Sequence, residues 1–225
     1  MHLNNHAQTH KRQGPNTRAI RAVDAVEDPF AGSTVDVARR LIGATLERII
    51  PHGEPDAGIL VSGRIVETEA YLPNVDPACH GYRGPTERTA ALFGRPGRSY
   101  VYFIYGVHYC FNVVTEPPGT GAAVLVRALE PIEGIAAMRR RRQPDTPVRA
   151  LASGPGNVCR SFCIGRECNG VDLRDGDLRI VFPVATPGRI AVAARVGLTA
   201  AADWPLRFYD PSSNTVSRPP RRKRG

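Results

Sequence analysis

The segment 99–128 constrains the fold more than any other part of the chain. It consists of three runs rich in β-branched and aromatic residues, with only a few residues between one run and the next. Gly106 lies in the first gap, and the sequence Pro-Pro-Gly-Thr-Gly fills the second. Connections this short can join antiparallel strands but cannot carry a crossover to a parallel one. The segment therefore predicts an antiparallel meander, with strands at 99–105, 109–115 and 122–128.

Further β-rich runs extend the predicted sheet on both sides of the meander. Two runs precede it, separated by a His-Gly-Glu-Pro turn segment, and three shorter runs follow it. These additional strands are predicted at 45–50, 59–71, 178–182, 190–196 and 206–209. The connection 72–98 is long and rich in Pro, Gly, Asp and Arg, and long ordered connections are usually functional.

Three stretches carry helix signals. Ser33 and Thr34 are candidate N-caps ahead of apolar residues at helical spacing. The stretch 130–142 has a proline near its start, acidic residues early and four arginines late, which suits the helix dipole at both ends. The sequence Ser-Gly-Pro-Gly at 153–156 is typical of a cap before a short helix to about Phe162. The predicted class is α+β, a single domain built on a mostly antiparallel, curved β-sheet with flanking helices.

The chain of 225 residues is long enough for one compact domain with residues left over at both ends. We place the domain at 29–210. Residues 1–28 are polar and basic without sustained periodicity, and 211–225 ends in a strongly basic run, so both are predicted to be disordered tails. The first residues contain no apolar stretch typical of a secretion signal or a membrane anchor. We therefore expect a cytoplasmic protein that is not secreted, associated with the nucleoid if the cell is bacterial.

The charge of the chain favours a polyanionic partner. Its formal net charge is +9, and Lys11 and Lys223 are its only lysines. Arginine binds phosphate through two parallel hydrogen bonds and stacks on bases, although a genomic bias in composition would also exchange lysine for arginine. A DNA lyase that works through a Schiff base needs an amine nucleophile. Because both lysines lie in the predicted tails, a lysine-based lyase is not expected.

Cysteine spacing and the standard motifs exclude several classes of site. The chain has five cysteines without a Cys-x-x-Cys pair, so a complete disulfide set is not possible and reduced thiols are predicted. Cys159 and Cys163 could share a helix face, but no His or Cys pair completes zinc spacing, and no metal is predicted. The sequence contains no Walker loop, no Gly-x-Gly-x-x-Gly and no nucleophile-elbow serine. No cofactor is expected.

The segment 64–127 brings together residue types that suit an enzyme acting on a flat base. Glu69 stands two residues before Tyr71, and a tyrosine-rich strand, an amide and an arginine follow. Glu67 shares a strand face with Glu69, so spacing alone allows either carboxylate to act as a general base. Tyr100 and Tyr102 share a face in the same way, and spacing does not decide which of them lines a pocket rather than the core.

Together these motifs closely resemble those of the alkyladenine (3-methyladenine) DNA glycosylases. The resemblance runs from about Asp28 to Tyr209, with the motifs in the same order throughout. The matching motifs are Arg-Ile-Val-Glu-Thr-Glu-Ala-Tyr at 64–71, His80, Tyr-Val-Tyr-Phe-Ile-Tyr-Gly at 100–106, Asn112, Arg-Ala-Leu-Glu-Pro at 127–131, Ser-Gly-Pro at 153–155 and Pro-Leu-Arg-Phe-Tyr at 205–209.

The resemblance assigns the base-binding residues. It implies that Tyr71, His80 and Tyr102 sandwich a purine that has been flipped out of the duplex. Electron-rich rings attract a base that alkylation has made cationic, by about 0.5 to 2 kcal/mol in the general cation–π case. Asn112 corresponds to the residue that meets the purine edge and crowds the exocyclic amine of guanine. Tyr105 corresponds to the wedge that fills the gap left in the DNA.

The resemblance also assigns the catalytic residues. It implies that Glu69 holds and deprotonates the water that attacks the sugar carbon, and that Arg127 orients this water and carboxylate. Glu67 is then expected to form a structural ion pair. The implied activity is that of a monomeric, monofunctional glycosylase of base excision repair, which acts on double-stranded DNA containing damaged purines and leaves an abasic site uncut. Alkylated adenines are the expected lesions, with hypoxanthine or 7-methylguanine as further candidates.

Two other functions remain open on sequence grounds. A non-catalytic nucleic-acid-binding module with this fold would use Tyr102 and Tyr105 only to stack bases. Such a module would have no use for a carboxylate and an arginine that position water, and it would release no base. An RNA-processing hydrolase is the third candidate, which a comparison of RNA with DNA of one sequence would test.

Overall fold

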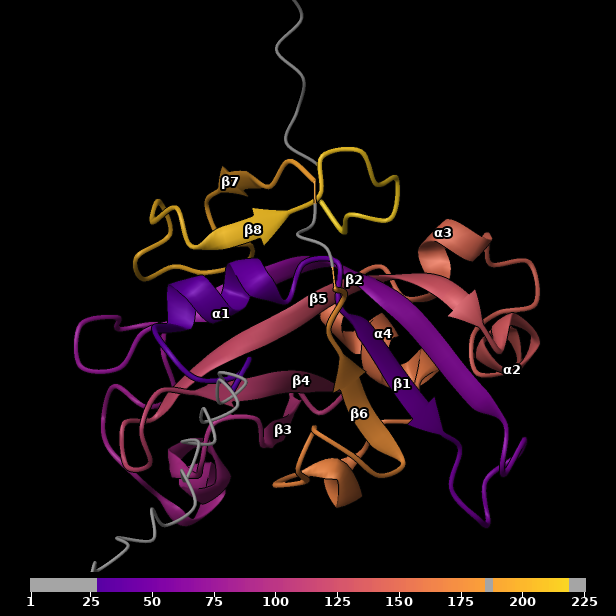
Figure 1. The fold of residues 1–225 in the computed structure, drawn as a ribbon, viewed down its shortest axis with the longest axis horizontal. Coiled ribbons are helices and arrows are strands. Elements are labelled where there is room, and N and C mark those ends of the chain that lie inside the picture. Colours follow the sequence, from indigo (N-terminus) through magenta and orange to yellow (C-terminus); the bar gives the residue numbers. More distant parts are fainter. Residues whose placement is uncertain (1–27, 185–187, 219–225) are drawn as a thin grey trace, which may run out of the picture.

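The computed structural model describes residues 28–184 and 188–218, and its centre is one curled sheet (Figure 1). Every strand pair in this described part of the chain is antiparallel, in the order β3-β4-β5-β2-β1-β6, and β8 joins β2 and β7 outside this path. The predicted α+β class is confirmed. The strands are β1 (Thr45–Ile49), β2 (Leu60–Tyr71), β3 (Ser99–Ile104), β4 (His108–Thr115), β5 (Ala122–Glu133), β6 (Leu178–Val181), β7 (Ala191–Ala193) and β8 (Arg207–Tyr209).

Strand β2 is the centre of the sheet because it changes partner halfway along its length. Its first half, residues 60–64, pairs with β1, whereas residues 67–69 pair with β8. Strand β5 pairs with β2 along the other edge, and the register shifts on both sides of Glu67. Such irregularities bend a strand and increase its twist. The second half of β2 therefore lies between β5 and β8, where the sheet curls into a half-barrel.

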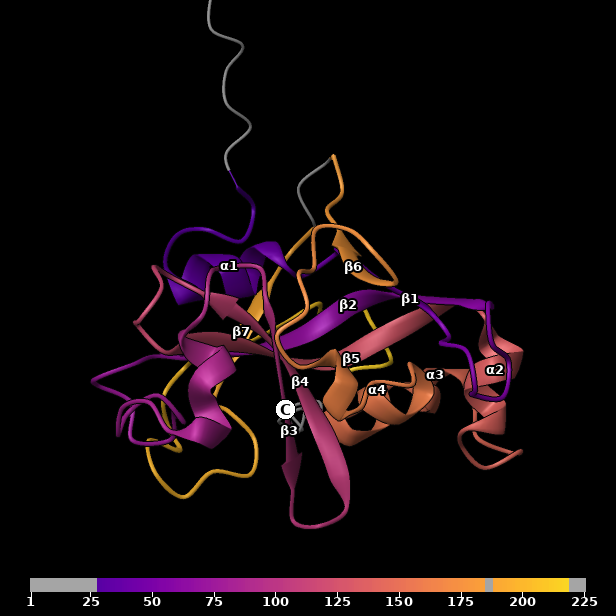
Figure 2. The same ribbon diagram turned by 90° about the horizontal axis from the view of Figure 1, so that it is seen from below.

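Helices cover both faces of the sheet (Figure 2). Helix α1 (Thr34–Arg40) begins at the predicted cap, where the Ser33 side chain accepts a hydrogen bond from the Asp36 N–H. It is joined to β2 by a hydrogen bond from the Thr68 hydroxyl to the Ala38 carbonyl at 2.9 Å. Helix α4 (Pro155–Ser161), also as predicted, has proline in its first turn and lies on the other side of the sheet. The 3₁₀ helix η2 (Arg166–Cys168) follows it.

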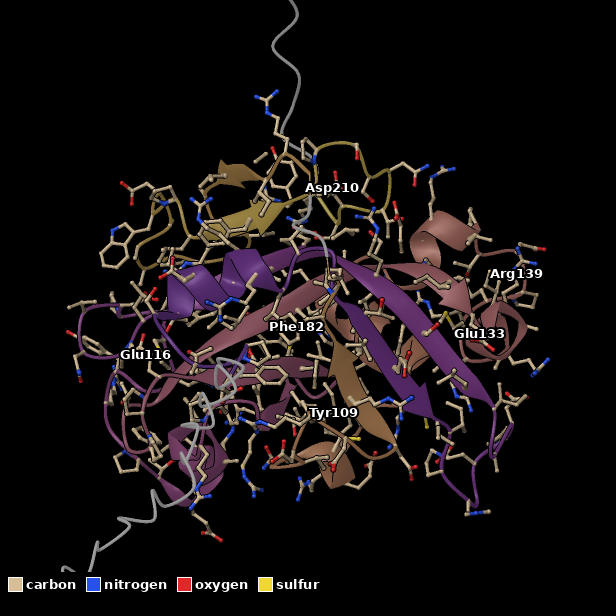
Figure 3. The ribbon with its side chains drawn as sticks, viewed as in Figure 1. Tyr109, Glu116, Glu133, Arg139, Phe182 and Asp210 are labelled. Carbon is tan, nitrogen blue, oxygen red and sulfur yellow. The ribbon has the colours of Figure 1, made fainter. Side chains whose placement is uncertain are left out.

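The predicted helix 130–142 is wrong at its start. Strand β5 continues to Glu133, and helix α2 (Ile135–Arg140) begins only after it. Figure 3 labels Glu133, the last residue of the strand, and Arg139 of the helix, which lie close together. The strand is extended because 130–133 pairs with the first half of β2, where Arg64 donates hydrogen bonds to Glu130. Gly134, with a φ of 71°, then ends the strand and begins the helix. Long-range pairing thus overrides a local helix signal.

Three helical segments, η1, α3 and the short η2, were not predicted from the sequence. The 3₁₀ helix η1 (Glu87–Phe93) lies within the long connection 72–98, and Thr86 and Thr89 close its start with a capping box. Helix α3 (Val148–Leu151) is a single turn. The first of these matters for the site, because Leu92 of η1 packs in a small buried cluster with Tyr100, Val114 and Ala123.

The five cysteines, predicted to be reduced, are free in the structure, and four of them are buried. The predicted tail 1–28 falls outside the described residues except for Asp28, and so does the end of 211–225. Within 211–218, Thr215 and Val216 are buried against the domain. The described helices are all too short or too polar to cross a membrane. The division into tails and domain and the cytoplasmic location stay predictions.

Candidate active site

A cavity of about 200 Å³ lies where the end of β2, the connection after it and the β3–β4 hairpin meet. It is lined by Tyr71, Ala78, Cys79, His80, Leu92, Tyr100, Tyr102, Ile104, Tyr105, Asn112, Ala123 and Leu198. All five residues that resemblance assigns to the base and the wedge are in this list. The cavity is mostly aromatic and apolar with a few polar groups, the composition typical of a ligand pocket.

One side of this cavity is a cluster of three rings, which are tilted relative to one another. The His80 and Tyr102 ring centroids are 4.5 Å apart, and those of Tyr100 and Tyr102 are 5.3 Å apart. Tyr100 is only 2% exposed and its hydroxyl lies 2.9 Å from His80 Nδ1, so it supports the histidine from the core side. Both tyrosines line the cavity, and Tyr102 is the one less enclosed by the core. Tyr71 lines the same cavity from the end of β2.

His80 lines the cavity from the connection after β2, and its surroundings favour the neutral imidazole. Desolvation by the neighbouring side chains, followed by the nearby charge of Arg88, lowers its pKa. A neutral imidazole attracts a cationic base through its ring, whereas an imidazolium would repel it. The environment of His80 therefore suits a wall against which a positively charged ring could lie.

Glu69 lies behind Tyr71 with a fully buried carboxylate. Its Oε2 accepts a hydrogen bond from the Tyr71 hydroxyl at 3.0 Å and one from Arg127 Nη1 at 3.2 Å. Its Oε1 accepts a single described bond, from the Val196 N–H at 2.7 Å. A carboxylate oxygen can accept two bonds, so Oε1 keeps capacity for one further donor.

Burial raises the pKa of Glu69 above its ordinary value near 4.5, although the charge of Arg127 and the hydrogen bonds from Val196 and Tyr71 act in the opposite direction. A raised pKa brings the carboxylate closer to the range in which a general base works well. Burial, and then the charge of Glu69, raises the pKa of Tyr71, so this phenol stays protonated and acts as a donor. The arrangement holds a carboxylate ready to take a proton.

Arg127 joins the two carboxylates of β2. Its Nε donates to Glu67 Oε1 and its Nη1 to Glu69 Oε2, each at 3.2 Å. Because one guanidinium reaches both, the two glutamates share a face, as the spacing predicts. Glu67 differs from Glu69 in its other partners: Arg207 Nη1 donates to it at 3.0 Å and the Ser217 N–H at 2.6 Å. The predicted ion pair of Glu67 is confirmed.

A second cavity, of about 410 Å³, adjoins the first and opens beside this charged cluster. The two cavities share Tyr71, Tyr102, Ile104, Tyr105 and Leu198 as lining residues. The second is also lined by Arg127, by Val196 and by Ser153, Gly154 and Pro155 at the start of α4. Glu69 is enclosed by Tyr71, Arg127 and Val196, which all line this cavity, so the carboxylate lies one layer behind its wall.

Asn112 lies in β4 on the floor of the first cavity and is 4% exposed. Its Nδ2 donates to the main-chain oxygen of Tyr100, its partner on β3, at 2.9 Å. This bond fixes the orientation of the amide. The amide thus has a structural bond across the strands and also borders the cavity.

Tyr105 projects from the tip of the β3–β4 hairpin, the loop that extends furthest downward in Figure 2. Its side chain is 81% exposed. Tyr105 and Gly106 both have positive φ, 54° and 66°, and the Val107 N–H bonds to the Ile104 carbonyl at 3.1 Å to close the turn. Positive φ is unfavourable for a tyrosine, and such residues are concentrated at functional sites. The backbone turn aims an aromatic ring into solvent.

A third cavity, of about 690 Å³, lies on the other face of the same hairpin. Phe103, His108 and Arg160 are among its lining residues. It contains none of the residues assigned to base binding or hydrolysis. Within the described ranges no group of three or more His, Cys, Asp or Glu side chains could hold a metal ion.

Several groups around Glu69 and Glu67 could not have been recognised from the sequence. Val196 and Ser217 contribute main-chain N–H groups, which every residue except proline carries, so their side chains give no signal. Ser217 also lies in the stretch assigned to the C-terminal tail. Arg207 is within the Pro-Leu-Arg-Phe-Tyr motif, but its pairing with Glu67 depends on β8 lying beside β2.

Comparison with known proteins places the chain in a family. Over 193 residues the chain is 48% identical to a protein of Methanoculleus marisnigri named "Putative 3-methyladenine DNA glycosylase", covering 84% of this chain and 96% of that protein. Proteins of the same name from Chlorobium luteolum and Rhodopseudomonas palustris are 42% and 46% identical over 190 residues, covering 84% of this chain and 94% and 86% of theirs. The family model described as methylpurine-DNA glycosylase matches residues 28–214. The chain belongs to the methylpurine-DNA glycosylase family.

Proposed function

We propose that the protein is a monofunctional DNA glycosylase that flips alkylated purines out of duplex DNA and hydrolyses their N-glycosidic bond with a water activated by Glu69. One observation carries the proposal: the hydroxyl of Tyr71, whose ring lines the aromatic cavity, bonds directly to the buried Glu69 carboxylate. A base against that ring would bring its sugar close to the carboxylate. The names of the relatives support 3-methyladenine as a substrate.

The aromatic cavity would bind the flipped base between Tyr71 on one side and the His80–Tyr102 pair on the other. These side chains come from separate parts of the chain and line one cavity. The rings would favour alkylated bases, because methylation at a ring nitrogen leaves a positive charge on the purine. Asn112 would meet the purine edge and discriminate by its fixed amide, since a buried polar group left unpaired costs affinity.

Glu69 would act as the general base. The water oxygen attacks C1′ of the sugar, the bond between C1′ and the purine nitrogen breaks, and the base leaves with the bonding electrons. The water proton passes to Glu69, whose Oε1 keeps capacity for one more hydrogen bond. Arg127 holds Oε2, and the carboxylate charge stabilises the positive charge that develops on the sugar. Tyr71, Arg127 and Val196 enclose Glu69. A side chain around the carboxylate therefore has to move when DNA binds, so that the water and the sugar can reach it.

Release of free base tests the proposed function. Incubation of the protein with methylated duplex DNA is expected to release 3-methyladenine, detected by chromatography. The strand should stay intact until alkali cleaves the abasic site, because a monofunctional enzyme does not cut the backbone. A protein that binds this DNA but releases no base from any alkylated, deaminated or etheno-adducted purine would instead be a binding module, and the proposal would be wrong.

The rate of base release should fall as the pH decreases through the pKa of Glu69. The base form is the carboxylate, so protonation removes activity, and burial places this pKa above the ordinary value near 4.5. The acid limb of the pH profile is therefore expected above pH 4.5 in single-turnover measurements with excess enzyme. DNA binding measured at each pH is the control. A limb at or below 4.5, with binding intact, would contradict the raised pKa.

Replacing Tyr105 with alanine should slow base release without lowering stability. The ring is 81% exposed and has few neighbours to lose, but in the proposed complex it fills the stack that the base leaves. Stacking on an aromatic side chain contributes about 1 to 3 kcal/mol per base, which corresponds to a roughly 5- to 150-fold lower rate or affinity. Tyr82→Ala, which removes another exposed tyrosine, is the matched control. Equal rates for both variants would exclude Tyr105 as the wedge.

A further inference from the structure

An ion pair between Asp76 and Arg195 lies behind the proposed pocket and has no exposed side-chain surface. Arg195 Nη1 is 2.5 Å from Asp76 Oδ2, and Nη2 is 2.8 Å from Oδ1, so two parallel hydrogen bonds join the guanidinium to the carboxylate. Nη1 also donates to the Ala70 carbonyl at 3.0 Å. As far as the structure describes them, the linings of the two cavities include neither residue. Burying two charges costs free energy, so a gain in stability alone does not explain why this ion pair is present.

Arg195 is connected to both of the uncharged groups that hold Glu69. Its guanidinium carbon lies 4.7 Å from the centroid of the Tyr71 ring, and the hydroxyl of that ring donates to Glu69 Oε2. The next residue, Val196, donates its N–H to Oε1. The Arg195 side chain therefore supports the Tyr71 ring from outside the cavities. The backbone of Arg195 also helps to fix the position of the Val196 N–H, the second donor to Glu69.

Asp76 organises the connection that leads to His80. Its Oδ1 accepts a hydrogen bond from the Ala78 N–H at 3.0 Å, and its Oδ2 accepts one from the Leu72 N–H at 3.3 Å. Its carbonyl accepts a bond from the Cys79 N–H at 2.9 Å. These bonds fold residues 72–79 into a compact turn, and His80 follows directly. The position of His80 is thus tied to the carboxylate that holds Arg195.

We propose that Asp76 and Arg195 form a clamp that positions Glu69, Tyr71 and His80 for base release. This inference rests on the proposed glycosylase function. The clamp joins the end of β2 and the connection that follows it to the segment after β7, which lies more than one hundred residues later in the chain. Arginine suits this task because its planar group can bind a carboxylate through two bonds and lie over an aromatic ring at once, which lysine cannot do. Arg195 is a positioning residue and does not contact substrate.

Arg195→Lys tests the clamp because it keeps the charge and removes the planar fork. A misplacement of reacting groups by about 1 Å can lower a rate about 100-fold, so we expect the single-turnover rate of base release to fall between about 10- and 100-fold. We also expect the acid limb of the pH profile to move to higher pH. Loosening the bonds from Val196 and Tyr71 removes two contacts that lower the pKa of Glu69.

Other charged and titratable groups face Glu69 and are unchanged in this variant, so they do not explain such a movement. They are Arg127 of β5, Glu67 of β2 and Cys110 of β4. If Arg195 had only a structural role, Arg195→Lys would have a lower melting temperature, but the acid limb measured on its folded molecules would stay at the wild-type pH. The pH profile therefore separates positioning from folding.

Arg64→Lys is the matched control, because Arg64 also bonds carboxylates, Glu130 and Asp210, but its described side-chain bonds do not involve Glu69, Tyr71 or the connection to His80. It is expected to keep the wild-type rate and acid limb.

If Arg195→Lys does not fold, Asp76→Asn carries the same test with Arg195 in place. A folded variant with the wild-type rate and acid limb would overturn the clamp, and failure of both variants to fold would assign the pair to stability. A wild-type protein that releases no base would overturn the proposed function and the clamp with it.

Discussion

Replacing Glu69 with glutamine is expected to lower the rate of base release by about 10²- to 10⁴-fold, the usual contribution of a general base. Glutamine has nearly the same shape and can still accept the hydrogen bond from the Val196 N–H, but it cannot take a proton from water. Binding to DNA that contains an abasic site should change little. Single-turnover release of 3-methyladenine, measured beside binding, separates the two effects.

Glu67→Gln is the control for this prediction, because Glu67 belongs to the same buried cluster and also bonds Arg127. Its remaining partners, Arg207 and the Ser217 N–H, hold it on the side of β8 and the C-terminal segment. We expect Glu67→Gln to lower stability and to keep a base-release rate much closer to that of the wild type. The opposite order of activities would assign the general base to Glu67 and contradict the proposed mechanism.

Replacing Arg127 with methionine is expected to lower the free energy of unfolding by roughly 3 to 5 kcal/mol, the typical cost of removing one partner from a buried ion pair. The Arg127 side chain is 7% exposed, and both Glu67 and Glu69 are completely buried beside it. Without the guanidinium, two neighbouring carboxylates lose a shared positive partner. Chemical denaturation at neutral pH measures this loss.

The stability lost in Arg127→Met should be partly recovered at lower pH. Removal of the positive charge raises the pKa of Glu69 further in the folded state than in the unfolded chain, so the folded variant binds more protons. Its free energy of unfolding relative to the wild type therefore increases as the pH falls toward that pKa. Arg127→Lys, which keeps a charge, should show a smaller loss and a weaker dependence on pH. A pH-independent difference would contradict the electrostatic explanation.

Much of the sheet could be predicted because its strands follow from local signals. The turn at Gly106 and the segment 117–121 allow only antiparallel neighbours, and β3, β4 and β5 form as expected. The end of β5 could not be predicted, since Pro131 and the charges after it favour a helix start. Only pairing with β2, more than sixty residues earlier, extends this strand to Glu133.

The residues of the candidate site also fall into two groups, those that the sequence identifies and those that only the structure reveals. The family resemblance assigns Glu69 and Tyr71 to one site, and the structure joins them by a hydrogen bond. Sequence could not identify Val196, whose contribution is a main-chain N–H. Nor could it pair Asp76 with Arg195, because 119 residues separate them and each is one of many similar charges in the chain. Groups that act through the backbone or across long separations become visible only in three dimensions.

A crystal structure of Glu69→Gln bound to duplex DNA with a single ethenoadenine would test the central proposal most directly. The proposal predicts the damaged base outside the helix, between the ring of Tyr71 and the His80–Tyr102 pair, with C1′ of its sugar facing residue 69 and the Tyr105 ring in the vacated stack. A base that remains stacked in the duplex, or that lies in the cavity beside Phe103 and His108, would contradict it.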